Sequence, residues 1–405
     1  MTTLLSISGY RYYLLVRVLM SLVATSLSIS IGWHIYQLTG NAFDLAKVAM
    51  VQVLPTWLLF IVSGWVVDQI SRARIIQLCM LIYVVVITAL ALEMSAEHFS
   101  VNKVLLLLFL FGCGRAFYFP AMQSILPTLV EKNLLTKAVS QSSTVWTIAM
   151  TTGPIVGGLV LEAFDKGVYW VLVALLCLSF LASLRLPNLM VKNRGGRSFS
   201  DLTLGIRFVW RDALVLPSIS LDLFIIMFAS VMALLPIYAA DILHLGPDGL
   251  GLLRAMPALG SVVSGIVIGR IGYGKHAGNA LFIALTGFAT SVLVFSLSTT
   301  LWLSLLALFC YGFADMVSVV IRSSITHLAT PDHLRGRVNA VNSLFIVSSN
   351  ELGDFRAGLV AGFVGVVHAA TLGALCAFGV VAMGYWRSKA LRGLQKVEDI
   401  ESPQE

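Results

Sequence analysis

Charged residues are scarce in this chain, and their scarcity excludes a water-soluble globular protein. Only 12% of the 405 residues are Asp, Glu, Lys or Arg, whereas 58% are hydrophobic. A soluble domain carries about 25% charged residues, so most of this chain's surface must face something other than water. Its apolar runs reach the roughly 20 residues that a membrane-spanning helix needs. We therefore expect an all-α membrane protein.

Cysteine is also rare, and the sequence motifs of enzymes are missing. The five cysteines are scattered through apolar runs without CxxC or Cys/His ligand spacing, which favours small buried hydrophobic residues over disulfides or a metal site. The sequence contains no HExxH, GxSxG or P-loop motif. We therefore expect no enzyme activity, no metal and no cofactor. Any energy for transport is then expected to come from an ion gradient or from the solute's own gradient.

Twelve apolar runs are long enough to cross a bilayer. They predict spans near residues 12–38, 43–67, 73–95, 103–129, 137–161, 167–186, 215–240, 247–271, 276–297, 300–328, 338–362 and 363–387. Arg17 interrupts the first run and no small-residue cleavage site follows it, so we expect this helix to be retained and not removed as a signal peptide.

Basic residues are distributed unequally between the predicted loops. Eighteen Lys and Arg residues fall on one side of the membrane, and two, Lys103 and Lys166, fall on the other. Since basic loops stay in the cytoplasm, we expect both termini on the cytoplasmic side of the membrane. This topology accounts for the net charge of +7 without nucleic acid. The expected partners are the lipid bilayer, a small-molecule substrate and protons, and we expect a monomer.

The sequence repeats itself at a shift of 200 residues. Leu105, Phe109, Gly112, Gly153 and Gly158 align with Leu305, Phe309, Gly312, Gly353 and Gly358. The repeat predicts two pseudo-symmetric six-helix bundles, residues 1–186 and 215–388, followed by a cytoplasmic tail at 389–405. Two such halves rock about a binding site near the middle of the membrane.

A cytoplasmic linker is expected between the two bundles, at residues 187–214. Within it Phe199, Leu202, Ile206, Val209 and Trp210 fall on one face of a helix, and Arg207 and Arg211 lie one turn apart. The pattern predicts a basic amphipathic helix at the membrane surface. We favour a linking role for this segment over a regulatory one.

Two glycine-containing motifs suggest a family. Gly64, Asp68, Arg72 and Arg74 follow the second span, and Gly153, Pro154, Gly157 and Gly158 end the fifth. With twelve spans, these residues resemble the loop 2–3 signature and the antiporter glycine–proline motif of the major facilitator superfamily. Gln69 and Ser71 depart from that signature. The resemblance implies a conformational gate in which Asp68 pairs with Arg72, although an ordinary interfacial salt bridge is the alternative.

Two further segments, residues 331–338 with Arg335 and Arg337 and residues 349–355, resemble the bacterial efflux branch that contains enterobactin exporters and macrolide efflux proteins. That resemblance implies proton-coupled export of a siderophore or drug-like compound by alternating access. It extends the gate to Arg335 and Arg337. Arg356 and Ala357 depart from the residues usual in that branch, which leaves the substrate open.

Charged residues inside the predicted spans are the candidate site, because a charge at the bilayer centre costs at least about 2.5–3.5 kcal/mol and needs a partner, water or a function. Arg115 in the fourth span and Asp315 in the tenth are equivalent at the 200-residue shift. We hypothesise that they face each other across the midline and that a proton on Asp315 or an anionic solute at Arg115 biases the pair. A static pair is the alternative, and Arg322 is a competing partner for Asp315.

Other intramembrane residues are further candidates for substrate binding or proton coupling. Asp222 in the seventh span and Arg17 in the first are expected to pair or to contact solute. Glu351 and Asp354 share one face of the eleventh span, where two carboxylates suit a proton carrier that Arg356 can quench.

Phe117 and Tyr118 follow Arg115 and suit a bulky aromatic or anionic solute, although we favour ordinary packing for them. Two other functions stay open. The first is a lipid transporter of the same fold, for example one for lysophospholipids, which should have a less charged cavity. The second is a non-transporting sensor or scaffold, which should carry a sizeable soluble domain.

Overall fold

The computed structural model describes residues 4–96, 99–188, 199–272, 276–331 and 334–395. These residues form helices joined by short turns, and no strand occurs among them, so the expected all-α class is confirmed. Ten stretches of the described chain are long and apolar enough to cross a membrane. One of them, Lys137–Ser183, contains two of the helices named below, and the expected eleventh span is not among the ten. The count of twelve spans therefore stays a prediction.

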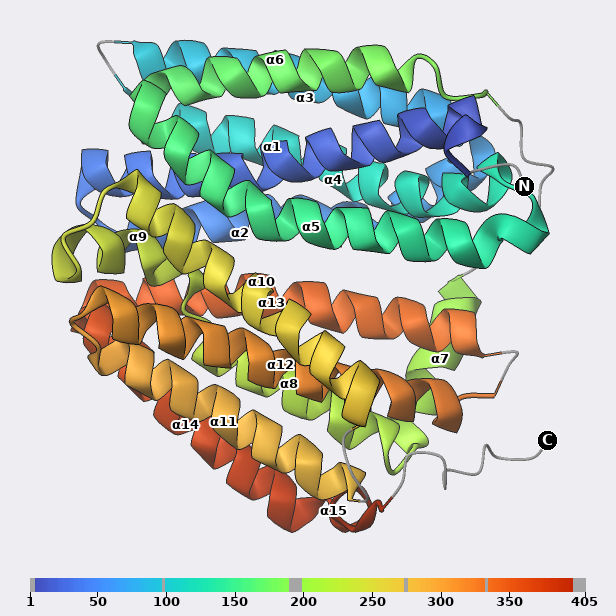
Figure 1. The fold of residues 1–405 in the computed structure, drawn as a ribbon, viewed down its shortest axis with the longest axis vertical. Helices are drawn as coiled ribbons and strands as arrows, with labels where there is room; N and C mark the ends of the chain where they lie inside the picture. The colour runs from blue at the N-terminus through green and yellow to red at the C-terminus, as the bar shows by residue number, and fades with distance from the viewer. Residues whose placement is uncertain (1–3, 97–98, 189–198, 273–275, 332–333, 396–405) are drawn as a thin grey trace. The chain divides into compact units, whose positions relative to one another are not determined.

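The chain divides into two compact units, whose helices are shown in Figure 1. Unit 1 comprises residues 1–40, 50–197 and 245–255, and unit 2 comprises residues 41–49, 198–244 and 256–405. The units therefore exchange short pieces of chain. The first residues of α2 belong to unit 2, and the first residues of α10 belong to unit 1.

The principal helices of the first half are α1 (Ser8–Thr39), α2 (Ala42–Gln69), α3 (Arg72–Ser95), α4 (Val101–Leu129), α5 (Lys132–Phe164) and α6 (Val168–Ser183). Those of the second half are α7 (Phe199–Arg211), α8 (Val215–Ala229), α10 (Pro247–Ile271), α11 (Ala277–Leu297), α12 (Leu301–Ala329), α13 (Arg335–Val364) and α14 (Val366–Arg387). The short α9 (Leu235–Ile237) and α15 (Lys389–Gly393) complete the set.

The same four helix pairs dominate the packing of each unit. In unit 1, α1 packs against α5 and α6, and α3 packs against α4 and α6. In unit 2, α8 packs against α13 and α14, and α11 packs against α12 and α14. These pairs correspond to one another at the 200-residue repeat, so the repeat seen in the sequence is also a repeat of contacts.

Glycines allow the closest of these contacts. A Cβ atom on Gly157 of α5 would lie 2.8 Å from the Cα of Ser26 on α1, and one on Gly153 would collide with Thr25. On the same helix, Gly158 faces Gly251 at the start of α10, within unit 1. Lipid offers no hydrophobic drive for helix association, so close backbone approach through small residues supplies the attraction instead. The glycine–proline motif is thus the packing seam of α5.

The seventh predicted span is a broken helix. α8 ends at Ala229, Ser230 is extended, and a 3-10 turn (Met232–Leu234), α9 and a π-helical turn (Tyr238–Ile242) follow. The equivalent helix of unit 1, α1, runs for 32 residues without a break. The sequence pattern predicted one continuous span at 215–240, and the difference is explained by the contacts of Ser230 described below.

The predicted linker helix is present as α7, and it is attached to unit 2. Val209 is buried in a cluster with residues of α8, α12 and α13, and Phe208 packs against the same cluster. Ile206 and Trp210 are exposed, so the apolar residues of α7 occupy two sides of the helix. The side chains of Phe199 and Leu202 lie outside the described residues.

The first residues of the expected cytoplasmic tail are also packed against unit 2. The carbonyl oxygens of Leu394 and Gln395 accept hydrogen bonds from the first backbone N–H groups of α11, at Gly278 and Ala277. These bonds satisfy donors that a helix N-terminus otherwise leaves without a partner.

The glycine seam gives a direct test. We expect Gly157→Ala to lower the apparent melting temperature of the detergent-solubilised chain, because an inserted methyl group that meets backbone costs about 1–3 kcal/mol. Gly64→Ala is the matched control, since a Cβ there meets no described atom within 4 Å and alanine favours a helix. A Gly157→Ala variant that melts no earlier than Gly64→Ala would contradict the packing role.

Candidate functional site

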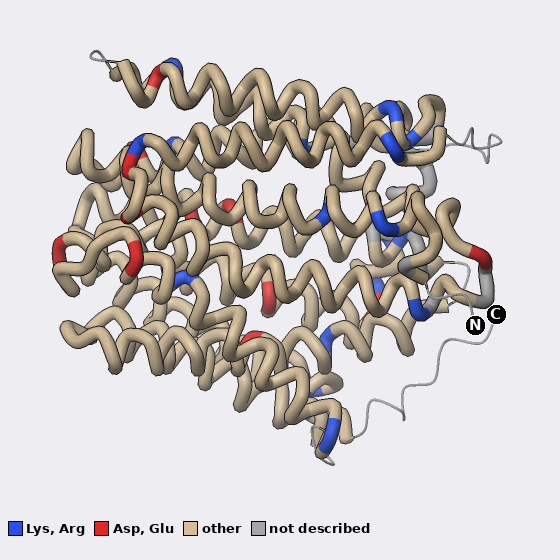
Figure 2. The backbone as a smooth tube through the Cα atoms, turned by 45° about the horizontal axis from the view of Figure 1, so that its top comes forward, with Lys and Arg blue, Asp and Glu red and all other residues tan. Residues whose placement is uncertain are grey.

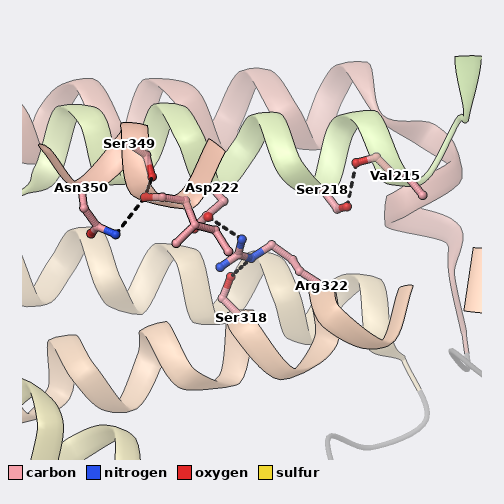
Figure 3. A network of polar contacts seen from close by, with 8 residues as sticks. Val215, Ser218, Asp222, Ser318, Arg322, Ser349 and Asn350 are labelled. Carbon is pink, nitrogen blue, oxygen red and sulfur yellow. Dashed lines mark hydrogen bonds and ion pairs between the residues drawn. The ribbon is translucent and has the colours of Figure 1, made fainter. Parts of the chain in front are cut away.

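The best-defined charged contact inside the membrane helices joins α8 to α12. Arg322 Nη1 lies 2.6 Å from Asp222 Oδ2, and both side chains are almost fully buried. Arg322 Nε also donates a hydrogen bond of 3.0 Å to Ser318 Oγ, one turn earlier on α12 (Figure 3). Sequence reasoning selected both charged residues but not as partners. It gave Arg322 as a competing partner for Asp315. It expected Asp222 and Arg17 to pair with each other or to contact solute.

Asp315 lies on α12 within electrostatic range of this pair. Both Asp222 and Arg322 act on its carboxyl group. Within the described part of unit 2, Asp315 itself makes no hydrogen bond or ion pair. The group of Asp222, Asp315 and Arg322, called here the acidic cluster, therefore contains two carboxyl groups and one guanidinium, and it can accept one further positive charge.

Tyr311 connects the acidic cluster to the eleventh predicted span. Its hydroxyl is within electrostatic range of Asp222, Asp315 and Asp354, and its ring lies 4.2 Å from that of Phe288, centroid to centroid. An aromatic side chain with a polar end can pack in a helix interior while its hydroxyl faces charged groups. The tyrosine was not selected from the sequence, where nothing distinguishes it from the other aromatic residues.

Asp354 and Arg356 hold the break in α8. Ser230 Oγ donates a hydrogen bond of 2.5 Å to Asp354 Oδ1, and Arg356 Nε donates one of 3.0 Å to the carbonyl of Met227. Arg356 Nη2 lies 3.4 Å from the carbonyl oxygen of Ser230. Carbonyl groups at a helix C-terminus lack intrahelical donors and carry partial negative charge, so the guanidinium satisfies both needs. Arg356 thus binds the main chain and also lies within electrostatic range of Asp354, and its quenching of Glu351 and Asp354 stays a prediction.

Two glycines make room for this contact. A Cβ on Gly353 of α13 would lie 2.7 Å from the carbonyl oxygen of Ile226, and one on Gly373 of α14 would lie 3.1 Å from Arg356 Nη2. Gly353 corresponds to Gly153 at the repeat. The equivalent of Asp354 in the first half is Pro154, and Val156 stands at the equivalent of Arg356. Only the second half therefore has the two charged residues that hold an interrupted helix.

Two arginines of unit 1, Arg17 and Arg254, have aromatic or hydroxyl partners. Arg17 Nη1 donates a hydrogen bond of 2.6 Å to Tyr13 Oη, and its guanidinium carbon lies 5.9 Å from the ring centre of Trp146 on α5. Arg254 Nη1 donates a hydrogen bond of 2.6 Å to Ser28 Oγ. Trp146 was missed in the sequence because a tryptophan in an apolar run gives no specific signal.

Arg115 and its aromatic neighbours lie on α4. Tyr118 is buried and its ring lies 6.1 Å from that of Tyr83, so this tyrosine is part of the packed interior, as the favoured interpretation held. Phe117 is half-buried. Arg115 belongs to unit 1 and Asp315 to unit 2, so their pairing stays a prediction.

The residues of the predicted gate are only partly described. Arg72 Nη1 donates a hydrogen bond of 2.9 Å to the carbonyl of Ser124 on α4, and Arg74 is exposed. The side chains of Asp68 and Arg335 lie outside the described residues, so their ion pairs stay predictions. Arg337 is half-buried at the start of α13.

Charged residues are distributed unevenly along the helices of the described chain. Figure 2 shows that Lys and Arg gather toward the helix ends nearest the chain termini and that few charged positions interrupt the middle of the helices. Apolar helices with a few partnered charges in their interior are the features of a multi-pass membrane transporter.

Comparison with known proteins defines the family. The profile described as the Major Facilitator Superfamily matches residues 13–353. The chain therefore belongs to the Major Facilitator Superfamily, and it is a transporter of a small-molecule substrate and not an enzyme.

Several bacterial relatives are similar over most of the chain. The multidrug efflux pump Tap of Mycolicibacterium fortuitum is 26% identical over 382 residues, which cover 88% of this chain and 90% of the pump. The enterobactin exporter EntS of Citrobacter koseri is 23% identical over 69% of this chain and 68% of the exporter. Macrolide efflux protein A of Streptococcus pyogenes is 23% identical over 61% of this chain, and the match spans only 62% of that protein.

Solved structures of transporters have the same fold. The nucleoside transporter NupG superposes with a TM-score of 0.69 at 13% identity, with 94% of this chain and 98% of the NupG chain covered. A transporter of the POT family in complex with 5-aminolevulinic acid gives a TM-score of 0.74 at 11% identity, with 95% and 96% covered. At such identities the likeness concerns the fold alone.

The buried ion pair predicts that a single variant loses much more stability than the double variant. We expect Arg322→Met to destabilise the chain by about 3–5 kcal/mol, because it leaves the Asp222 carboxylate buried without its partner. The double variant Asp222→Leu/Arg322→Met should recover most of this loss, since it removes both charges. The measurement is the apparent melting temperature in detergent.

Lys103→Met is the control for this experiment. Lys103 pairs with Glu93 at 3.3 Å, but its side chain is 65% exposed, and exposed pairs contribute only about 0–1 kcal/mol. If the double variant melts as early as Arg322→Met alone, the two residues are not each other's principal partner.

Proposed function

We propose that this chain is a proton-coupled exporter of a siderophore or drug-like compound that works by alternating access. Its relatives named above are a multidrug pump, a macrolide efflux protein and an enterobactin exporter, which supports export over uptake. The observation that carries proton coupling is the acidic cluster, in which Asp222 pairs with Arg322 and Asp315 lies within electrostatic range of both.

The acidic cluster suits a coupling site for a physical reason. When Asp315 is protonated, Arg322 is neutralised by Asp222 alone and the cluster carries no net charge. When Asp315 is ionised, the cluster has an excess negative charge inside the membrane, which is costly unless water or another cation faces it. Protonation therefore favours a state in which the cluster is enclosed, and ionisation favours one in which it is open. This charged interior also weighs against the lipid-transport alternative.

Several further features belong to the same proposal. Residues 1–186 and 215–388 act as the two rocking bundles, and residues 187–214 link them. Both termini lie in the cytoplasm, the protein is a monomer in the bacterial inner membrane, and the gate consists of Gly64, Asp68, Arg72, Arg74, Arg335 and Arg337. The concentration of Lys and Arg positions near the helix ends beside the termini supports this orientation.

Transport in proteoliposomes tests the coupling. We expect purified wild-type chain to accumulate ethidium, a macrolide or a catecholate siderophore against its gradient when the vesicle lumen is acidic. Asp315→Asn should lower this gradient-driven accumulation at least about tenfold, because the amide cannot exchange a proton. Exchange of labelled for unlabelled solute without a gradient should persist.

Glu93→Gln serves as the control, since Glu93 pairs with Lys103 at a helix end. It should accumulate solute like the wild type. Full gradient-driven accumulation by Asp315→Asn would remove Asp315 from the coupling mechanism. A wild-type chain that ignores the pH gradient with every probe would refute proton coupling itself.

We also propose that Arg115 and Asp315 pair in one transport state. Arg115→Asp and Asp315→Arg should each reduce transport strongly, and the charge swap that combines them should restore a measurable part of any solute exchange lost in the single variants. Exchange activity is the proper readout, because a swapped pair keeps the attraction but moves the carboxylate. No recovery in the swap would argue against direct pairing.

A further inference from the structure

Arg17 of α1 carries a charge that forms no ion pair with a described residue of unit 1. Its guanidinium uses one N–H group on Tyr13 and lies 6.0 Å and 5.9 Å from the ring centres of Tyr13 and Trp146. Its Nε is buried and has no hydrogen-bond partner among the described residues. No carboxylate of the described chain lies within ion-pair distance of it. A guanidinium has five N–H donors, so most of its capacity is unused.

Two carboxylates of unit 1 are engaged elsewhere. Glu93 pairs with Lys103 at one helix end, and Asp165 binds His34 at 2.9 Å in the turn after α5. The acidic cluster of the chain is in unit 2. A cation held in a membrane helix without a counter-ion requires water or an anion beside it.

The surface beside Arg17 is polar and open. Trp146 is 40% exposed, and Ser143 and Thr147, which lie three residues before and one after it, are exposed as well. Residues at spacings of three and four share a helix face, so Ser143 lies on the same face as Trp146 and as Thr147. No hydrogen bond from either hydroxyl or from the indole N–H reaches a described residue. Hydroxyl groups are costly in hydrocarbon, so this face of α5 suits contact with water or solute.

We propose that Arg17, Trp146, Ser143 and Thr147 form a binding site for an aromatic carboxylate. The carboxylate accepts hydrogen bonds from the guanidinium, whose planar fork matches two carboxylate oxygens. The aromatic ring of the solute packs against the exposed indole ring. Ser143 and Thr147 donate to further oxygen atoms on the solute. This inference rests on the proposed transport function, of which the aromatic carboxylate is the cargo class.

The sign of the charge separates this site from the acidic cluster. The site in unit 1 offers a guanidinium without a carboxylate, whereas the acidic cluster has a carboxylate in excess. An anionic solute and a proton therefore have separate binding groups in separate units. A cationic or neutral aromatic compound would pack against the indole ring but would lack a carboxylate to pair with the guanidinium.

A matched pair of probes tests the proposal. We expect 2-hydroxybenzoate to bind the detergent-purified full-length chain in calorimetry and 2-hydroxybenzamide, its neutral counterpart, to bind at least about tenfold more weakly. Arg17→Gln should weaken 2-hydroxybenzoate at least about tenfold and leave the amide unchanged. Arg17→Lys should retain part of the affinity, because it keeps the charge and loses the fork.

Two further variants keep the test independent of folding defects. Trp146→Phe should bind 2-hydroxybenzoate nearly as well as the wild type, and Trp146→Ala should lose several-fold. Arg11→Gln is the control, since Arg11 is exposed on the same helix. Equal affinity for the two probes, or unchanged 2-hydroxybenzoate binding by a folded Arg17→Gln variant, would overturn the proposal.

The binding measurement uses no proton gradient, so it fails separately from the proposed function. If ethidium follows the pH gradient but 2-hydroxybenzoate does not bind, the aromatic carboxylate site is rejected and proton-coupled export stands. If 2-hydroxybenzoate binds with the expected dependence on Arg17 but no probe responds to the gradient, the site stands and proton coupling is rejected.

Discussion

A charge surrounded by hydrocarbon persists only where another charge, a dipole or water faces it, and this constraint shapes the interior of both units. Asp222 and Arg322 satisfy it by a direct ion pair between α8 and α12. Arg356 satisfies it with the carbonyl groups at the end of α8. Arg17 satisfies it partly, through a tyrosine hydroxyl and two aromatic rings. Each solution ties helices together at a specific point, so the few charges of the interior also determine where the helices meet.

Close packing of small residues completes the assembly of each unit. The repeated helix pairs of the two units depend on glycines that bring backbones within van der Waals distance, such as Gly157 against Ser26 and Gly353 against Ile226. The two halves keep glycine at the equivalent positions 112 and 312, 153 and 353, and 158 and 358, whereas Ala357 stands at the equivalent of Gly157 and the polar residues differ. The scaffold is therefore common to the halves, and the chemistry is divided between them.

The sequence predicts the scaffold well because its signals are local or periodic. Apolar runs indicate the spans, and glycines recurring at a 200-residue shift indicate the repeat. Charged residues in apolar runs were selected as candidate site residues, but the pairing of Asp222 with Arg322 was not predicted. The pairing of Asp222 with Arg322 depends on how two helices are rotated about their axes, which hydropathy does not encode. Trp146 was missed because its exposure, and not its type, distinguishes it.

The break in α8 shows the same limit more sharply. No glycine or proline stands at Ser230, and the local signal is Pro236, which marks the start of α9 after the break. The break is stabilised by Asp354 and Arg356, which lie 124 and 126 residues farther along the chain. Only the folded unit brings these groups together.

Arg356 gives this break an unusual independence from the surroundings. In other transporters, a dissolved metal ion can supply the positive charge at the C-terminal end of an interrupted helix. Here the cation is the guanidinium of Arg356, a side chain of α13, so it cannot dissociate or exchange with ions in solution. The break in α8 therefore keeps this positive charge at any salt concentration. A movement that separates α13 from α8 also removes the charge from the break. One side chain thus couples the position of one helix to the continuity of another.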